Sequence, residues 1–217
     1  MHIAEGMLSG PVLLTGAAVT ATGVAIGLRR MDYERLPRVA LLSSAFFVAS
    51  LIHIPIGPSS VHLVLNGLAG VVLGWAAFPA LLVAMLLQSV MFSFGGLTAL
   101  GVNVAAMALP AVAVRGLLGR GVRSQRAPTA FVSGFAAGAL AIALSALLIA
   151  LALYLSNRRA FLSLIHAALL AHVPVMLIEG LVTGSAVGFL SKVKPEVLEP
   201  GEEPVLLTEA AHAETVP

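Results

Sequence analysis

The sequence predicts an all-α, polytopic membrane protein with about seven transmembrane helices. Of its 217 residues, 59% are hydrophobic and only 10% are charged, whereas an average soluble domain carries about 25% charged residues. So few charges cannot cover a water-facing surface, which excludes a water-soluble enzyme. The apolar runs are long and rich in Ala, Leu and Val, as in membrane-spanning helices. The absence of cysteine excludes disulfides, thiolate metal sites and cysteine nucleophiles.

Seven apolar segments, some short and some long, fit the roughly 20 residues that a spanning helix needs. They are residues 10–28, 39–56, 60–75, 77–94, 97–118, 128–155 and 161–190. The last segment is long enough to be tilted or to be broken at Pro174. Other prolines lie at or near segment ends, where proline is tolerated; these are Pro55, Pro58, Pro79 and Pro110.

The chain divides into a membrane domain, residues 1–194, and a C-terminal tail, residues 195–217. The tail holds four prolines and six of the ten acidic residues, a composition typical of disorder. We predict that it extends from the membrane into the cytoplasm.

The basic residues predict the orientation in the lipid bilayer. In the seven-helix arrangement, ten of the 12 Lys and Arg residues fall on one side, and the positive-inside rule makes that side cytoplasmic. The ten are Arg29, Arg30, Arg35, Arg38, Arg115, Arg120, Arg123, Arg126, Lys192 and Lys194. The C-terminus is then cytoplasmic and the N-terminus outside. This placement in loops, with a net charge of only +2, argues against a nucleic-acid partner.

The N-terminus offers three nitrogen ligands to a metal ion. The α-amine of Met1 and the amide nitrogen and Nδ1 of His2 form two fused chelate rings in one plane, leaving one position for a second histidine. All-nitrogen tetragonal sites suit Ni(II) and Cu(II), whereas Zn(II) prefers a tetrahedron. The alternative is that this end merely frays, as most termini do.

His62 is the predicted fourth ligand. It follows a Gly/Pro/Ser break at the expected outer start of the third helix, on the same side as the N-terminus. On that helix Asn66 would share its face and could fix the imidazole by a hydrogen bond, and Ser60 is a second candidate for supporting the ligand. Ser59 and Ser60 could also cap the helix start. The alternative is a buried histidine bonded to a neighbouring carbonyl. His53 is the second choice of ligand.

Glu179 is the most costly residue to bury, because a carboxylate within a membrane span is expensive. It is expected to face the interior, either as the partner of a buried histidine or as a structural hydrogen-bond acceptor. Together with His53, His166 and His172 it suggests an alternative function, a secondary cation transporter or channel with a relay of intramembrane His and Glu residues. An intramembrane metalloprotease is disfavoured because no His-Glu-x-x-His motif is present.

A small-residue stripe on the first segment predicts close helix packing. Ala17, Ala21 and Ala25 repeat at intervals of four, and small residues let helices approach closely in lipid. The stripe is interpreted either as a docking face for a partner or as internal packing of the bundle.

Two motifs resemble those of the CbiM/NikM family, the substrate-binding S-components of energy-coupling-factor (ECF) uptake transporters for cobalt and nickel. They are the start Met-His-Ile-Ala-Glu-Gly-Met-Leu and the later Ser-Ser-Val-His-Leu-Val-Leu-Asn-Gly-Leu. The resemblance implies an N-terminal segment that enters the bundle from outside. It also implies metal ligation by Met1, His2 and His62, with Ni(II) or Co(II) as transported ligand and no permanent cofactor.

The resemblance implies partners as well. They are a transmembrane T-component and two ATPase subunits in a prokaryotic inner membrane, joined in some family members by a small accessory membrane subunit. The first helix would dock them, which matches the alanine stripe. The chain itself contains no nucleotide-binding P-loop, so ATP hydrolysis is expected on the partners and not here.

Overall fold

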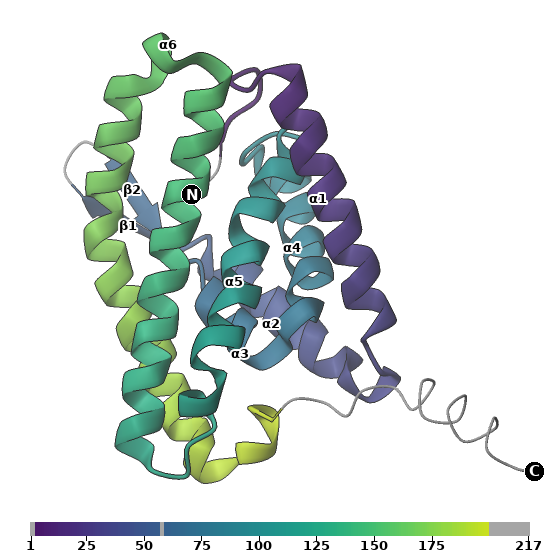
Figure 1. Cartoon of the computed structure of the whole chain (residues 1–217), viewed down its shortest axis with the longest axis vertical. Coiled ribbons are helices and arrows are strands. Elements are labelled where there is room, and N and C mark those ends of the chain that lie inside the picture. The colour runs from purple at the N-terminus through teal and green to yellow at the C-terminus, as the bar shows by residue number, and fades with distance from the viewer. Residues whose placement is uncertain (1–2, 57–58, 200–217) are drawn as a thin grey trace, which may run out of the picture.

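The computed structural model describes residues 3–56 and 59–199, with the backbone alone at residues 35, 53–56, 59–62 and 158. Six helices and one short hairpin make up the fold (Figure 1). The helices are α1 Gly10–Arg29, α2 Leu36–Ala49, α3 Asn66–Leu73, α4 Ala77–Phe92, α5 Leu100–Val122 and α6 Ala127–Val193. The hairpin pairs β1 (His53–Ile56) antiparallel with β2 (Ser59–His62).

The helix α6 is two membrane spans joined at Asn157. That residue has an extended backbone (φ −162°, ψ 90°), and its side-chain oxygen accepts a hydrogen bond from the Ala160 N–H at 3.2 Å. An Asn that bonds the N–H three residues on is the usual cap of a helix start, so the second span begins here. Of the two alternatives for the last segment, tilt or a break at Pro174, the break does not occur, because this proline lies inside α6 and the non-helical residue is Asn157.

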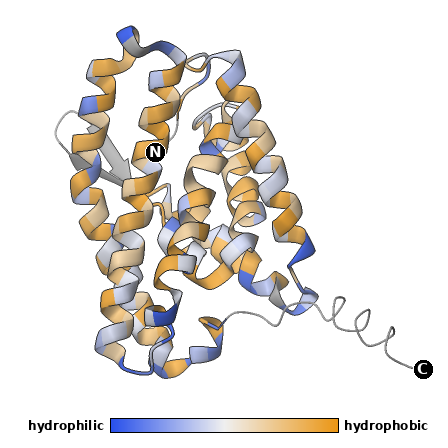
Figure 2. Cartoon of the chain, in the orientation of Figure 1, coloured by the Kyte–Doolittle hydropathy of each residue, from blue (hydrophilic) through white to orange (hydrophobic). Residues whose placement is uncertain are grey.

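Five helical stretches in the described part of the chain are long and apolar enough to cross a membrane. They are Gly10–Arg29, Asn66–Phe92, Leu100–Val122, Ala127–Asn157 and Arg159–Val193. The chain is therefore a multi-pass helical membrane protein. Hydrophobic residues predominate along the helices, and polar residues are concentrated at the two ends of the bundle (Figure 2).

The predicted helices over 39–56 and 60–75 are wrong in extent. The first splits into α2 and β1, and the second into β2 and α3. Leu65 has a left-handed backbone with φ 56°, which no α-helix can continue through, so α3 starts only at Asn66. Pro55 lies in β1 and Pro110 inside α5, so these prolines do not mark helix ends.

The core forms around α5, which contacts α1, α3, α4 and α6. Its largest buried group includes Phe46, Phe78, Met85, Met107 and Ile142. The folded region also extends past residue 194. Residues Pro195–Val197 form a 3₁₀ turn and Leu198 is buried, so 195–199 belong to the fold although the sequence assigned them to the tail. The remainder of the tail lies outside the described residues.

Candidate metal centre

The N-terminal segment enters the bundle at Ile3. Its side chain is 3% exposed and packs in a cluster with Val102 of α5 and Ile149 of α6. The Ile3 N–H donates to Oδ1 of Asn103 at 2.9 Å, and Nδ2 of Asn103 donates back to the Ile3 carbonyl at 3.1 Å. The buried amide of Asn103 therefore pairs with both main-chain groups of Ile3, as a neighbouring strand would.

Two further hydrogen bonds hold the segment between Ile3 and α1. The Thr98 N–H donates to Oε1 of Glu5 at 3.3 Å, and the Ser9 N–H donates to Oγ of Ser156 at 3.1 Å. The segment is thus fixed to the loop before α5 and to the end of the first α6 span. Met1 and His2, the predicted ligands, lie outside the described residues. His2 is joined directly to the anchored Ile3, and Met1 to His2.

His62 ends strand β2 and pairs in register with His53 of β1. It is therefore not on the third helix, and the prediction that it shares a helical face with Asn66 is wrong. Ser59 and Ser60 lie in the same strand, so they do not cap that helix. The hairpin does bring the backbones of His62 and His53, the first and second choices of ligand, side by side.

Asn66, the first residue of α3, is fully buried. Its Nδ2 donates to Oγ of Ser145 at 2.9 Å and to the Met107 carbonyl at 3.4 Å. Its Oδ1 has no hydrogen-bond partner among the described residues. Its support of a metal ligand, like that of Ser60, stays a prediction.

Glu179 acts as a structural acceptor. The carboxylate is fully buried and accepts hydrogen bonds from the Val64 and Leu65 N–H groups. Leu65 approaches both carboxylate oxygens, at 2.9 and 3.0 Å. Glu179 therefore fixes the chain between the hairpin and α3.

The structure gives little support to a His and Glu relay. Nδ1 of His172 donates to the Ala168 carbonyl within its own helix at 2.6 Å, and His166 is exposed on α6. Across the described ranges no three His, Cys, Asp or Glu side chains cluster as metal ligands would.

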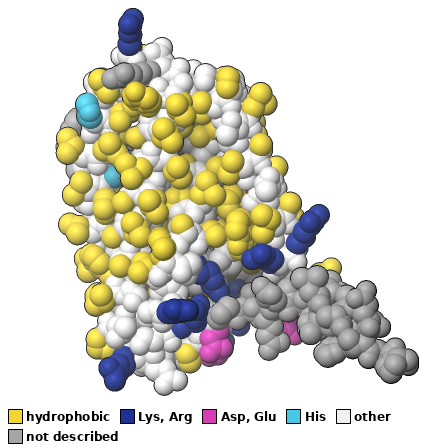
Figure 3. Space-filling view, in the orientation of Figure 1, with side chains coloured by type: hydrophobic (Ala, Val, Ile, Leu, Met, Phe, Trp, Pro, Cys, Tyr) yellow, Lys and Arg dark blue, Asp and Glu magenta, His cyan; other side chains and the backbone are white. Residues whose placement is uncertain are grey.

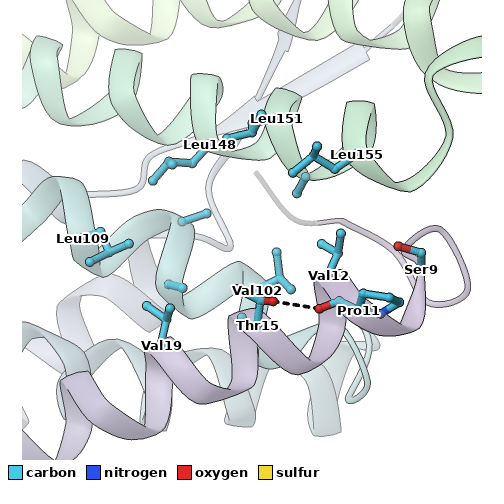
Figure 4. Close-up of a pocket in the computed structure, with 14 residues that line it drawn as sticks. Ser9, Pro11, Val12, Thr15, Val19, Val102, Leu109, Leu148, Leu151 and Leu155 are labelled. Carbon is cyan, nitrogen blue, oxygen red and sulfur yellow. Dashed lines mark hydrogen bonds between the residues drawn. The ribbon is translucent and has the colours of Figure 1, made fainter.

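An apolar groove lies between α1 and the first span of α6, with α5 as its floor (Figure 4). Its polar side chains are Ser9 and Thr15, and Thr15 donates its hydroxyl proton to the Pro11 carbonyl at 2.8 Å. The described residues that line it include no His, Asp or Glu, so it is not the predicted metal site.

The two small-residue faces of α1 are separated. Glycines face inward: Gly16 lies against Val102, Gly23 against Phe78 and Gly27 against Trp75. The alanines of the predicted stripe, Ala17, Ala21 and Ala25, are exposed. Internal packing is thus carried mainly by glycine. Ala17 also lies against Gly101 of α5, whereas Ala21 and Ala25 are left on the outer face of the helix.

These features define the class: a multi-pass helical membrane protein with its N-terminal segment anchored inside the bundle. The chain belongs to the CbiM family, because residues 2–197 match the cobalt uptake substrate-specific transmembrane region. A Haemophilus influenzae protein assigned to metal transport is 43% identical over 199 residues, covering 91% of this chain and 97% of its own.

The chain is also similar to a nickel transport protein and to a solved transporter structure. The fused nickel transport protein NikMN of Rhodobacter capsulatus is 36% identical over 138 residues, which is 58% of this chain and 40% of that longer protein. The crystal structure of a transition metal transporter shares the fold over the whole of both chains, with a TM-score of 0.66 at 23% identity. The family and these relatives concern metal transport and not catalysis.

Proposed function

We propose that this chain is the metal-capture subunit of an ATP-driven, ECF-type uptake system for Ni(II) or Co(II). The observation that supports it best is the anchored Ile3. Asn103 holds this residue inside the bundle, and the next residue toward the N-terminus is His2. Membership in a cobalt uptake family makes a metal the expected ligand of that end.

The proposed site is a plane of four nitrogens. The amine of Met1 and the amide and imidazole of His2 supply three of them, and His62 supplies the fourth. Deprotonated amide and imidazole nitrogens in a plane favour Ni(II), and Co(II) accepts the same donor types.

The charge distribution supports the proposed orientation. Lys and Arg side chains gather at the end of the bundle where α6 terminates, whereas the opposite end shows few (Figure 3). The positive-inside rule makes the first end cytoplasmic. The N-terminal segment then closes the site from outside, and the metal leaves inward when the partner ATPases drive reorientation.

His62→Ala is expected to remove metal binding without unfolding the protein. The loss of the fourth nitrogen opens the plane to water and should lower affinity by at least about 100-fold. Elemental analysis of the purified chain, with an optical spectrum for planar Ni(II), measures this and also distinguishes nickel from cobalt. His166→Ala, an exposed histidine of α6, is the matched control, and equal metal content in both variants would contradict the proposed site.

The exposed alanine face of α1 is the proposed docking surface for the T-component and ATPase subunits, with which a small accessory membrane subunit would also assemble. Ala21→Leu is expected to reduce co-purification of the partners several-fold, because a larger side chain prevents close helix approach. Metal binding by the isolated chain should be unchanged. Ala167→Leu, at an exposed position of the second α6 span, is the control, and wild-type assembly of Ala21→Leu would exclude this surface.

A channel or proton-coupled carrier is the remaining alternative. It would transport cations without partner ATPases and would not depend on the N-terminal amine. The use of Glu179 and His172 in main-chain hydrogen bonds disfavours it.

A further inference from the structure

Two buried polar side chains in the bundle bind main chain next to the proposed ligands. Asn103 of α5 is 1% exposed and Glu179 of α6 is fully buried. Asn103 holds Ile3, the residue after His2, and Glu179 holds Val64 and Leu65, which follow His62 by two and three positions. Buried polar groups in a membrane span are costly and mark functional positions.

The Asn103 contact fixes orientation as well as position. Its two hydrogen bonds, at 2.9 and 3.1 Å, engage the N–H and the carbonyl of the same residue. A pair of bonds to one residue restrains its rotation, which one bond would not. Because consecutive Cα atoms lie about 3.8 Å apart, a fixed Ile3 restricts the position of His2 to a small volume.

The Glu179 hydrogen bonds stabilise a backbone conformation at Leu65 that is unfavourable by itself. Leu65 adopts φ 56°, which is uncommon for a residue with a branched side chain. The carboxylate accepts from the N–H of this residue and of the one before it. Such strain persists only where the surroundings impose it, and it clusters at functional sites. The imposed turn sets where β2 ends, and therefore where His62 lies.

We propose that Asn103 and Glu179 are positioning residues that hold the two halves of the metal site in place before the metal arrives. The inference rests on the proposed function. A planar site needs its nitrogens placed to within about 0.5 Å, and the two halves come from segments some 60 residues apart in the chain. The helices α5 and α6, which carry Asn103 and Glu179, pack directly against each other. The two sets of hydrogen bonds, which we call clamps, are therefore held by one packed helix pair.

The test measures hydrogen exchange and metal release separately. Exchange is followed by mass spectrometry in the metal-free protein, in peptides covering residues 1–8 and 59–68. Asn103→Leu should raise exchange only in the first peptide, and Glu179→Gln only in the second. In both variants the affinity for Ni(II) and Co(II) should fall about 10- to 100-fold, mainly through faster dissociation. Asn103→Asp keeps the acceptor for the Ile3 N–H and should show a smaller loss.

The controls alter buried hydroxyls near each clamp. Thr20 donates to the Gly101 carbonyl at 2.6 Å where α1 meets α5, and Thr183 lies one turn from Glu179 with no hydroxyl partner among the described residues. Thr20→Val and Thr183→Val should leave exchange in both peptides and metal release as in the wild type.

Three results would overturn the inference. Wild-type exchange in the assigned peptide, or wild-type metal release, would show that the clamp does not position its ligand while leaving the proposed function intact. A rise in exchange throughout the bundle would show that the side chains only maintain the fold. Failure of the wild-type protein to bind either metal would instead refute the proposed function itself.

Discussion

A variant with several residues added in front of Met1 is expected to lose Ni(II) and Co(II) binding almost completely and to keep its fold. The extension converts the α-amine into an amide, which is a weak ligand unless it is deprotonated. The chelate ring between the amine and the His2 amide is lost, and only the ring between that amide and the imidazole remains. We expect a fall in affinity of at least about 1,000-fold, or roughly 4 kcal/mol, measured by calorimetry on the purified chain.

The length of the extension matters. A single added residue would place the histidine third in the chain, where the amine, two amides and the imidazole can surround Ni(II) without His62. The variant should therefore carry at least three added residues. An extension of equal length after Pro217 is the control and should bind as the wild type does. Wild-type affinity with the N-terminal extension would refute ligation by the amine.

Among the proposed substitutions, Gly70→Ala is expected to lower the free energy of unfolding most. Gly70 lies on α3 directly against the backbone of Ala111 in α5, and an added Cβ would meet the carbonyl oxygen of Ala111 and come within 2.6 Å of its carbonyl carbon and 2.7 Å of its Cα. Backbone cannot rotate away as a side chain can. The substitution should lower the free energy of unfolding by about 3 kcal/mol, the upper range for overpacking, and lower the melting temperature in detergent.

Gly116→Ala is the matched control for that substitution. Gly116 lies in α5, and a Cβ there would meet nothing within 4 Å. Since Ala favours the helix over Gly by about 0.5–1 kcal/mol, this variant should melt at or above the wild-type temperature. If Gly70→Ala melts like Gly116→Ala, then α3 does not pack on α5 as described.

Composition and periodicity were sufficient for the membrane class and for most helices. The predicted segments 10–28, 77–94, 97–118 and 128–155 match α1, α4, α5 and the first α6 span closely. The predicted segments failed between residues 50 and 66, where an apolar stretch forms the β1–β2 hairpin instead of a helix. Hydropathy alone cannot separate a short apolar strand from a helix. The turn that separates them depends on Glu179, more than 110 residues away.

The polar residues likewise divide into those that the sequence singled out and those whose role only the tertiary structure showed. Sequence chemistry alone singled out Met1, His2 and His62, because chelation depends on the order of atoms along the chain. Glu179 stood out by its cost, but both of its interpretations were open. Asn103 was not recognised, since an amide in an apolar helix carries no local pattern that names its partner, and Ile3 lies 100 residues away.

The sequence by itself determined that this is a multi-pass membrane protein of a metal uptake family, and it predicted the candidate ligands. The membrane class follows from transfer free energies and the candidate chelate from the covalent order of atoms, both of which are local, whereas the family follows from the resemblance of two motifs. Only the tertiary structure decided that α1 turns glycines inward and alanines outward, that the hairpin replaces a helix, and that Asn103 and Glu179 hold the main chain. Those outcomes depend on which buried polar groups find partners across the bundle, and that is settled only when the whole chain is packed.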